Sequence, residues 1–174
     1  MRRSSALRAA LGRRAFEELT VLVGGDVISV LWDMAKLYDM VQLPVLCEEL
    51  AKRSYPQELL VPGCIVHAAP NSLRVGNSFG PTVSECSNSI LAGDQQSVSW
   101  TRGLLWKLMD KLTCVDPENP CWSHVDDLSH VLIGESEGDL RKKWLAAGRH
   151  VGSEVARLRL KLSDKSQVRR QRTN

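Results

Sequence analysis

Residues 122–133 read WSHVDDLSHVLI, and this stretch has the strongest influence on the fold expected for the chain. Two runs of strand-like residues, 122–125 and 128–133, flank the acidic pair Asp126 and Asp127. Two such runs separated by two polar residues predict a β-hairpin with the acidic pair at its turn. The pair also has a plainer interpretation, because aspartate is common in turns for purely local reasons.

A second strand is predicted upstream, where the apolar run Val27–Trp32 ends at Asp33. A short, β-branched apolar run is typical of a strand that is buried in a sheet. Helices are predicted where apolar residues recur every three to four positions, over residues 5–22, 44–55, 95–112 and 136–157. Further strands are predicted at 64–67, 72–75 and 158–162, with a loop over 76–89.

The order of these elements favours an α+β fold, an antiparallel sheet with helices packed on one face. In the last predicted helix, Ser136 is a candidate N-cap, and the apolar side chains form one stripe. The residues expected on the inner side of this helix are Leu140, Trp144, Val151 and Val155.

Composition fits a globular protein of one domain. The chain has 174 residues, 43% of them apolar and 25% charged, which disfavours a wholly disordered chain. No apolar run approaches the roughly 18–20 residues of a membrane span, so no membrane insertion is expected. The 23 basic and 20 acidic residues give a net charge of +3, with basic residues concentrated at both ends.

The five cysteines indicate the compartment. Their number is odd and no CxxC pair is present, which predicts reduced, intracellular thiols rather than disulfides or structural zinc. We therefore expect a nuclear or cytoplasmic protein. The Arg-rich first 16 residues also fit a mitochondrial transit peptide, which leaves that location open.

Three aspartates are candidate metal ligands, since Asp33 ends a predicted strand and Asp126 and Asp127 lie in the predicted hairpin. Strand ends are rigid enough to hold carboxylates in a fixed arrangement. Mg²⁺ prefers oxygen ligands and takes one or two protein carboxylates together with substrate phosphates. Two such ions about 3.5–4 Å apart can stabilise the attacking and leaving oxygens of a phosphoryl transfer. Carboxylates gathered without a metal would repel one another.

Four segments, in the expected order, resemble motifs A to D of reverse transcriptases. Asp33–Asp39 resembles motif A, in which an aromatic residue follows the aspartate five positions later. His124–Leu128 is similar to the aromatic-x-Asp-Asp hairpin of motif C. Leu91–Ser97 resembles motif B, where a glycine and a glutamine precede a helix. Leu160–Ser166 resembles motif D, which follows a helix and ends near a lysine.

The resemblance spans residues 27–166 and implies the palm of a retroelement-type reverse transcriptase, an RNA-directed DNA polymerase. By this resemblance, Asp33, Asp126 and Asp127 would be catalytic and would hold two Mg²⁺ ions, with Mn²⁺ as a substitute. The ions would activate a primer 3′-hydroxyl and stabilise the pyrophosphate leaving group. Lys165 would match the motif D lysine that assists proton transfer to pyrophosphate; it also reads as a surface lysine.

Two further residues are implied to bind substrate. Tyr38 would lie under the sugar of the incoming nucleotide, and Gln96 would lie near the templating base or the nucleotide. Each has a structural alternative, a core aromatic for Tyr38 and a polar residue at a helix start for Gln96. The chain departs from the motifs where Gln95 replaces a proline, Ser97 a glycine and His124 an aromatic residue.

The expected organisation is a basic helical lead-in over 1–24, a palm over 25–166 and a disordered basic tail over 167–174. We expect most of the fingers and thumb to be absent and to come from further segments or a partner chain. The implied partners are an RNA or DNA template–primer and dNTPs. The alternatives are an inactive retroelement remnant, a nucleic-acid-binding module, or another metal-dependent phosphotransferase or nuclease that uses the same three acids.

Overall fold

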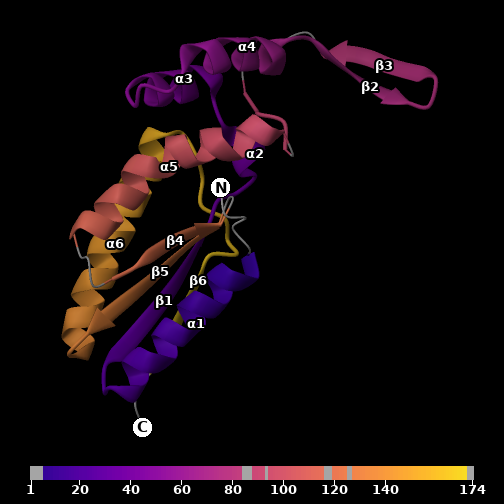
Figure 1. Ribbon diagram of the computed structural model, residues 1–174. Helices are drawn as coiled ribbons and strands as arrows, with labels where there is room; N and C mark the ends of the chain where they lie inside the picture. Colours follow the sequence, from indigo (N-terminus) through magenta and orange to yellow (C-terminus); the bar gives the residue numbers. More distant parts are fainter. Residues whose placement is uncertain (1–5, 84–87, 93, 116–118, 125–126, 172–174) are drawn as a thin grey trace. The chain divides into compact units, whose positions relative to one another are not determined.

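The computed structural model of the chain describes residues 6–83, 88–92, 94–115, 119–124 and 127–171 (Figure 1). Two structural units are present. Unit 1 comprises residues 1–35, 106–157 and 161–174, and unit 2 comprises residues 36–105 and 158–160. Within the described ranges, every helix is too short or too polar to span a bilayer.

Unit 1 is built on a four-stranded antiparallel sheet. In spatial order its strands are β4 (Cys121–His124), β5 (Asp127–Gly134), β1 (Asp26–Asp33) and β6 (Gln167–Gln171). The apolar strands β1 and β5 take the two central positions because their side chains need cover on both faces. The predicted strand before Asp33 and the predicted α+β class are confirmed. The predicted hairpin is also present, but Asp127, which was expected in its turn, is the first residue of β5 and pairs with His124.

One face of this sheet is covered by α6 (Glu137–Arg157), whose residues Leu140, Val151 and Val155 are buried. The Ser136 hydroxyl accepts a hydrogen bond from the Asp139 N–H (3.2 Å), so the predicted N-cap is confirmed. Trp144 was expected on the inner side of this helix, and that prediction is wrong because its side chain is 37% exposed.

The opposite face of the sheet is partly covered by α1 (Ala6–Leu22). The Glu17 carboxylate is almost fully buried there and accepts a hydrogen bond from the Ser29 hydroxyl of β1 (2.7 Å). The ring of Phe16 meets that of Trp122 edge-on, with centroids 6.0 Å apart. Helices therefore lie on both faces of the sheet, beyond the single covered face that was expected.

Unit 2 is mainly helical. It contains α2 (Leu37–Met40), α3 (Leu43–Ala51), α4 (Gln57–Ala68), the hairpin of β2 (Asn71–Val75) and β3 (Ser78–Val83), and the start of α5 (Gln95–Val115). Its core consists of large apolar side chains from α3, α4 and α5, among them Leu46, Leu50, Leu60, Trp100 and Leu104.

The second hairpin lies further along the chain than the sequence suggested. Residues 64–67, predicted as its first strand, belong to α4, and part of the predicted loop 76–89 forms β3. A short, mainly apolar run does not by itself distinguish a strand from a buried helix segment. The turn is made at Gly76, whose φ of 60° lies in the left-handed region that glycine adopts without strain.

The C-terminal prediction also needs correction. Residues 158–162 form no regular strand; Leu162 makes only an isolated bridge to Met34. Residues 167–171, expected in the disordered tail, form β6 and pair with β1. β6 is an edge strand that is held by backbone hydrogen bonds, and its side chains are mostly exposed. The sequence of this segment therefore has no alternation of apolar and polar residues that would predict a strand.

Candidate functional site

The register of the sheet brings two of the predicted metal ligands together. Asp33 is the last residue of β1, Asp127 is the first residue of β5, and the two are direct partners in the antiparallel ladder. Opposed residues of such a ladder point to the same face, with Cβ atoms about 4.5–5.5 Å apart. Both side chains are half-buried. This geometry suits two carboxylates that share ligands or a cation.

Asp126, the third predicted ligand, lies outside the described residues. Its neighbours in the hairpin are placed on either side, with His124 at the end of β4 and Asp127 as its ladder partner in β5. Among the described residues no group of three or more His, Cys, Asp and Glu side chains could hold a metal ion. The described part of the site thus supplies the two carboxylates of Asp33 and Asp127.

The segment that carries Lys165 is fastened to the backbone of Asp33. The Asp33 carbonyl accepts a hydrogen bond from the Ser163 N–H (2.8 Å), and the Asp33 N–H donates to the Ser166 hydroxyl (3.1 Å). Two residues on, the Ala35 N–H donates to the carbonyl of Lys161 (2.8 Å). Lys165 itself is exposed. The structure therefore brings the Lys165 segment and the Asp33 strand end side by side.

α1 lies on the same face of the sheet as the two aspartates. Alternate residues of a strand share a face, so Ser29 faces the same way as Asp33, and Ser129 the same way as Asp127. Both serines bond α1, since the Ser29 hydroxyl donates to Glu17 and the Ser129 hydroxyl accepts from Arg13 (3.0 Å).

The two predicted substrate-binding residues belong to unit 2. Tyr38 lies in α2, half-buried, and its carbonyl accepts a hydrogen bond from the Ile90 N–H (2.9 Å). Gln96 lies in the first turn of α5, and its N–H donates to a carboxylate oxygen of Asp94 (2.9 Å). Ser97, which replaces the glycine of motif B, is fully buried, and its hydroxyl donates to the Leu91 carbonyl (2.7 Å).

A buried histidine, His67, positions the start of α5, a role that was not predicted from the sequence. The His67 Nδ1 atom accepts a hydrogen bond from the Leu91 N–H (3.1 Å), and its Nε2 atom lies 3.3 Å from the Asp94 carboxylate. The ring packs against that of Trp100, with centroids 5.1 Å apart. Asp94, one residue before α5 begins, was the available signal, because aspartate favours such positions. His67 and Asp94 thereby position the turn that carries Gln96.

The donor set fits a hard divalent cation. Two like charges directly opposite each other on neighbouring strands are destabilising, and among the described residues no ion pair involves the Asp33 carboxylate. A magnesium ion between Asp33 and Asp127 would remove this repulsion. It needs only one or two protein carboxylates, because waters and substrate phosphates complete its octahedral shell.

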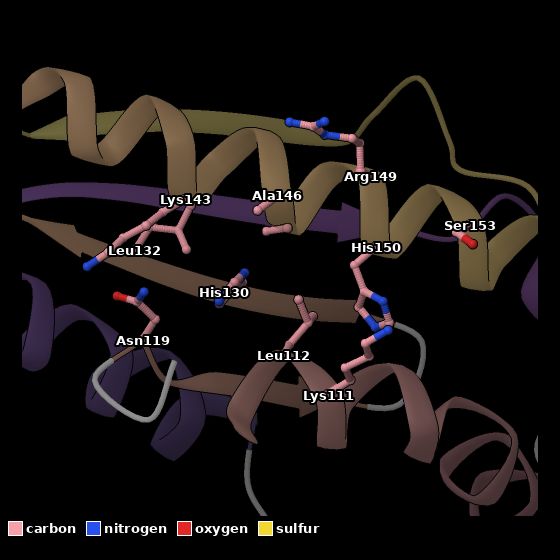
Figure 2. A pocket seen from close by; sticks show the side chains of 11 residues that line it. Lys111, Leu112, Asn119, His130, Leu132, Lys143, Ala146, Arg149, His150 and Ser153 are labelled. Carbon is pink, nitrogen blue, oxygen red and sulfur yellow. The ribbon is translucent and has the colours of Figure 1, made fainter. Parts of the chain in front are cut away.

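A separate cleft lies on the other face of the sheet (Figure 2). Its volume is about 440 Å³, and it is lined by residues of β5, α5 and α6, including His130, Leu132, Leu112, Ala146 and His150. His130 and Leu132 alternate with Asp127 along β5 and therefore face away from it. The cleft is consequently not part of the carboxylate site.

At one end of this cleft, burial lowers the pKa of His150, and the positive charge of Lys111 lowers it further. We expect Lys111→Met to raise the pKa of His150. NMR titration of the C2 proton of the His150 imidazole ring measures this change. Arg149→Met is the matched control, because Arg149 lines the same cleft and is not among the charges that shift His150. Equal shifts in the two variants would contradict this prediction.

The lowered pKa of His150 also determines how the stability of the fold changes with pH. The folded-state pKa of His150 lies below its unfolded value of about 6.5, so the unfolded chain binds the proton more readily. The contribution of neutral His150 to stability is therefore complete above about pH 6.5 and is lost as the pH falls through the folded-state pKa. Chemical denaturation at a series of pH values, with and without His150→Gln, measures this contribution.

Comparisons with known proteins give a likeness of fold. No protein-family model matches the sequence, and no curated protein matches it either. Among solved structures, the chain is similar to apo telomerase from Candida tropicalis truncated from the C-terminal domain, with a TM-score of 0.66 and 12% sequence identity. The match covers 97% of this chain and 36% of the telomerase chain. The fold is therefore α+β and polymerase-palm-like.

Proposed function

We propose that this chain is the palm of a reverse-transcriptase-like enzyme that extends a primer by two-metal nucleotidyl transfer. The observation that carries the proposal is the ladder pairing of Asp33 with Asp127 in an antiparallel sheet. The likeness of the fold to telomerase, a reverse-transcriptase-related enzyme, supports it. The four motif-like segments of the sequence occur in the same order as motifs A to D of that class.

In this proposal Asp33, Asp126 and Asp127 hold two Mg²⁺ ions. When bound, the ions supply Lewis-acid stabilisation to the primer oxygen and to the leaving pyrophosphate. The protein keeps the carboxylates in place, because Asp33 is held by β5 on one side and by the Ser163 and Ser166 hydrogen bonds on the other. Little reorganisation is then needed when substrate arrives.

Lys165 is proposed to act as the proton donor to the leaving pyrophosphate. Its support is the attachment of its segment to Asp33, together with the exposure of its side chain. Tyr38 and Gln96 are proposed to contact the incoming nucleotide. For Gln96, the Asp94 hydrogen bond at the start of α5 supplies a fixed backbone position.

The proposed partners are an RNA or DNA template–primer and dNTPs. The chain spans about a third of the length of the telomerase it matches, 36%. A second candidate function is a palm unit that binds metal and nucleic acid without extending a primer. In either case the groups that grip the template–primer are expected from further segments or a partner chain.

The test combines two measurements on the full chain. Thermal unfolding with and without Mg²⁺ should show stabilisation by millimolar metal, and primer extension on an RNA template should show nucleotide incorporation. The double variant Asp33→Ala/Asp126→Ala should lose both responses. Metal stabilisation without extension would favour the second candidate, and the absence of both responses, or equal responses from the double variant, would contradict the proposed function.

A further inference from the structure

Two cysteines that are 17 positions apart in the sequence face each other in unit 2. Cys47 lies in α3 and Cys64 in α4, and their sulfur atoms are 3.1 Å apart, within hydrogen-bonding distance for thiols. Neither lies in a CxxC pair, so both were predicted from the sequence to be ordinary reduced thiols. Among the described residues, no third ligand joins them to form a metal site.

The pair is accessible from solvent. Both side chains are half-buried, and both line a groove of about 530 Å³ between α3 and α4. The rest of the groove is formed mainly by apolar and small side chains, among them Ala51, Leu60, Val61 and Ala68. A small oxidant can therefore reach the sulfur atoms without unfolding the unit.

We propose that Cys47 and Cys64 form a reversible disulfide that joins α3 to α4, with a glutathione-type disulfide as the oxidant. A disulfide has an S–S length of about 2.05 Å, so the sulfur atoms have to approach each other by roughly 1 Å. Side-chain rotation can supply a movement of this size. The proposal is independent of the proposed polymerase function, because neither cysteine is a proposed metal ligand or nucleotide contact.

The chemistry requires two successive exchanges. The Cys47 thiolate attacks glutathione disulfide, forms a mixed disulfide and releases one glutathione thiolate. The Cys64 thiol then loses its proton to the released thiolate, attacks the Cys47 sulfur and expels the second glutathione thiolate. Two protein thiols are oxidised and one glutathione disulfide is reduced, so two electrons are exchanged.

The environment of Cys64 sets the order and the speed of these steps. Burial raises the pKa of Cys64 to about 12, and the hydrogen bond with Cys47 adds to this shift. Cys64 is therefore a protonated thiol near neutral pH and is assigned the second, resolving step. Oxidation is expected to be slow at pH 7 and to accelerate with rising pH.

The cross-link would act on a tightly packed part of the unit. Gly63, the neighbour of Cys64, lies so close to α5 that a Cβ added there would be 2.5 Å from the Trp100 ring and 2.6 Å from the Gln96 side chain. α4 therefore has little freedom to move toward α5. The disulfide is expected to tighten α3 against α4 and to stabilise the unit.

The test is an equilibration of the full-length chain with mixtures of reduced and oxidised glutathione at pH 8. Free thiols are then blocked with N-ethylmaleimide, and trypsin digestion precedes mass spectrometry. The expected product is a linked pair of peptides, residues 37–52 and 54–74, which dithiothreitol separates. The oxidised chain is expected to unfold roughly 6–12 °C above the reduced chain, because the bridge closes a loop of 18 residues.

Four variants decide the outcome. Cys47→Ser and Cys64→Ser should each lose the linked peptides and the rise in Tm, and Cys121→Ser should keep both. Cys64→Ala, checked by circular dichroism, separates a lost cross-link from a misfolded chain. Glutathione adducts on Cys47 or Cys64 without linked peptides, or no reaction even with the thiol oxidant diamide, would overturn the proposal.

Discussion

Replacing Asp33 by asparagine is expected to reduce the rate of metal-dependent nucleotide incorporation by about 10³-fold, the loss found when one preorganised group that stabilises transition-state charge is removed. The variant keeps the shape of the side chain and loses its charge. In the absence of metal, its Tm should equal or exceed that of the wild type, because the repulsion with Asp127 across the ladder is removed. A loss of activity without a loss of stability would mark a functional residue.

Asp26→Asn is the matched control for this prediction. Asp26 is the first residue of the same strand, at the opposite end from Asp33, and its carboxylate lies 3.6 Å from Arg170. This partly exposed pair should contribute little to stability and nothing to incorporation. Single-turnover primer extension and Mg²⁺-dependent thermal shifts measure both variants. If Asp33→Asn and Asp26→Asn behave alike, the assignment of Asp33 is wrong.

The second large effect is expected at Gly63. Gly63→Val is expected to destabilise the protein by about 3 kcal/mol or more, because its side chain would overlap Trp100, which is fully buried. Valine is favoured over glycine in a helix by roughly half a kcal/mol, which offsets only a small part of this overlap. α4 would have to move away from α5 to accommodate the new side chain.

Gly152→Val tests whether the site or the residue type is responsible. Gly152 lies in α6, another helix, and a Cβ added there meets no atom within 4 Å. This variant should unfold within about 0.5 kcal/mol of the wild type. Urea denaturation measures both free energies of unfolding. Equal destabilisation by the two substitutions would contradict the prediction, because close packing at Gly63 would then not be the cause.

Local patterns predicted the part of the fold that surrounds the aspartates. The hairpin around Asp126 and Asp127, the apolar strand that ends at Asp33 and the cap at Ser136 each depend on residues close together in the chain. Trp144 was placed wrongly because a helical stripe gives the direction of a side chain but not how far the covering layer extends. The strand predicted at 64–67 failed because a short, mainly apolar run fits a strand and a helix equally well.

The residues of the candidate site could be named from the sequence, but their spatial arrangement could be predicted only in part. The motifs named Asp33 and Asp127, and the ladder then placed them opposite each other. The motif D segment was recognised by Lys165, but its attachment to Asp33 depends on the hydroxyl of Ser166 and the N–H of Ser163. Tyr38 and Gln96 remain predictions, as does Asp126. His67 was missed because nothing in its neighbourhood in the chain indicates the partner at Asp94.

Elements with local signals could be predicted from the residues alone; these signals are apolar periodicity, helix caps and the acidic hairpin that begins at residue 122. Three features emerged only in the folded chain: the register of Asp33 with Asp127, the strand formed by residues 167–171 and the proximity of Cys47 and Cys64. The physical reason is that these features depend on backbone hydrogen bonds and packing between distant segments. Backbone N–H and C=O groups are common to almost every residue, so they leave no signal in the sequence. Side chains such as those of the two cysteines meet only when the chain folds.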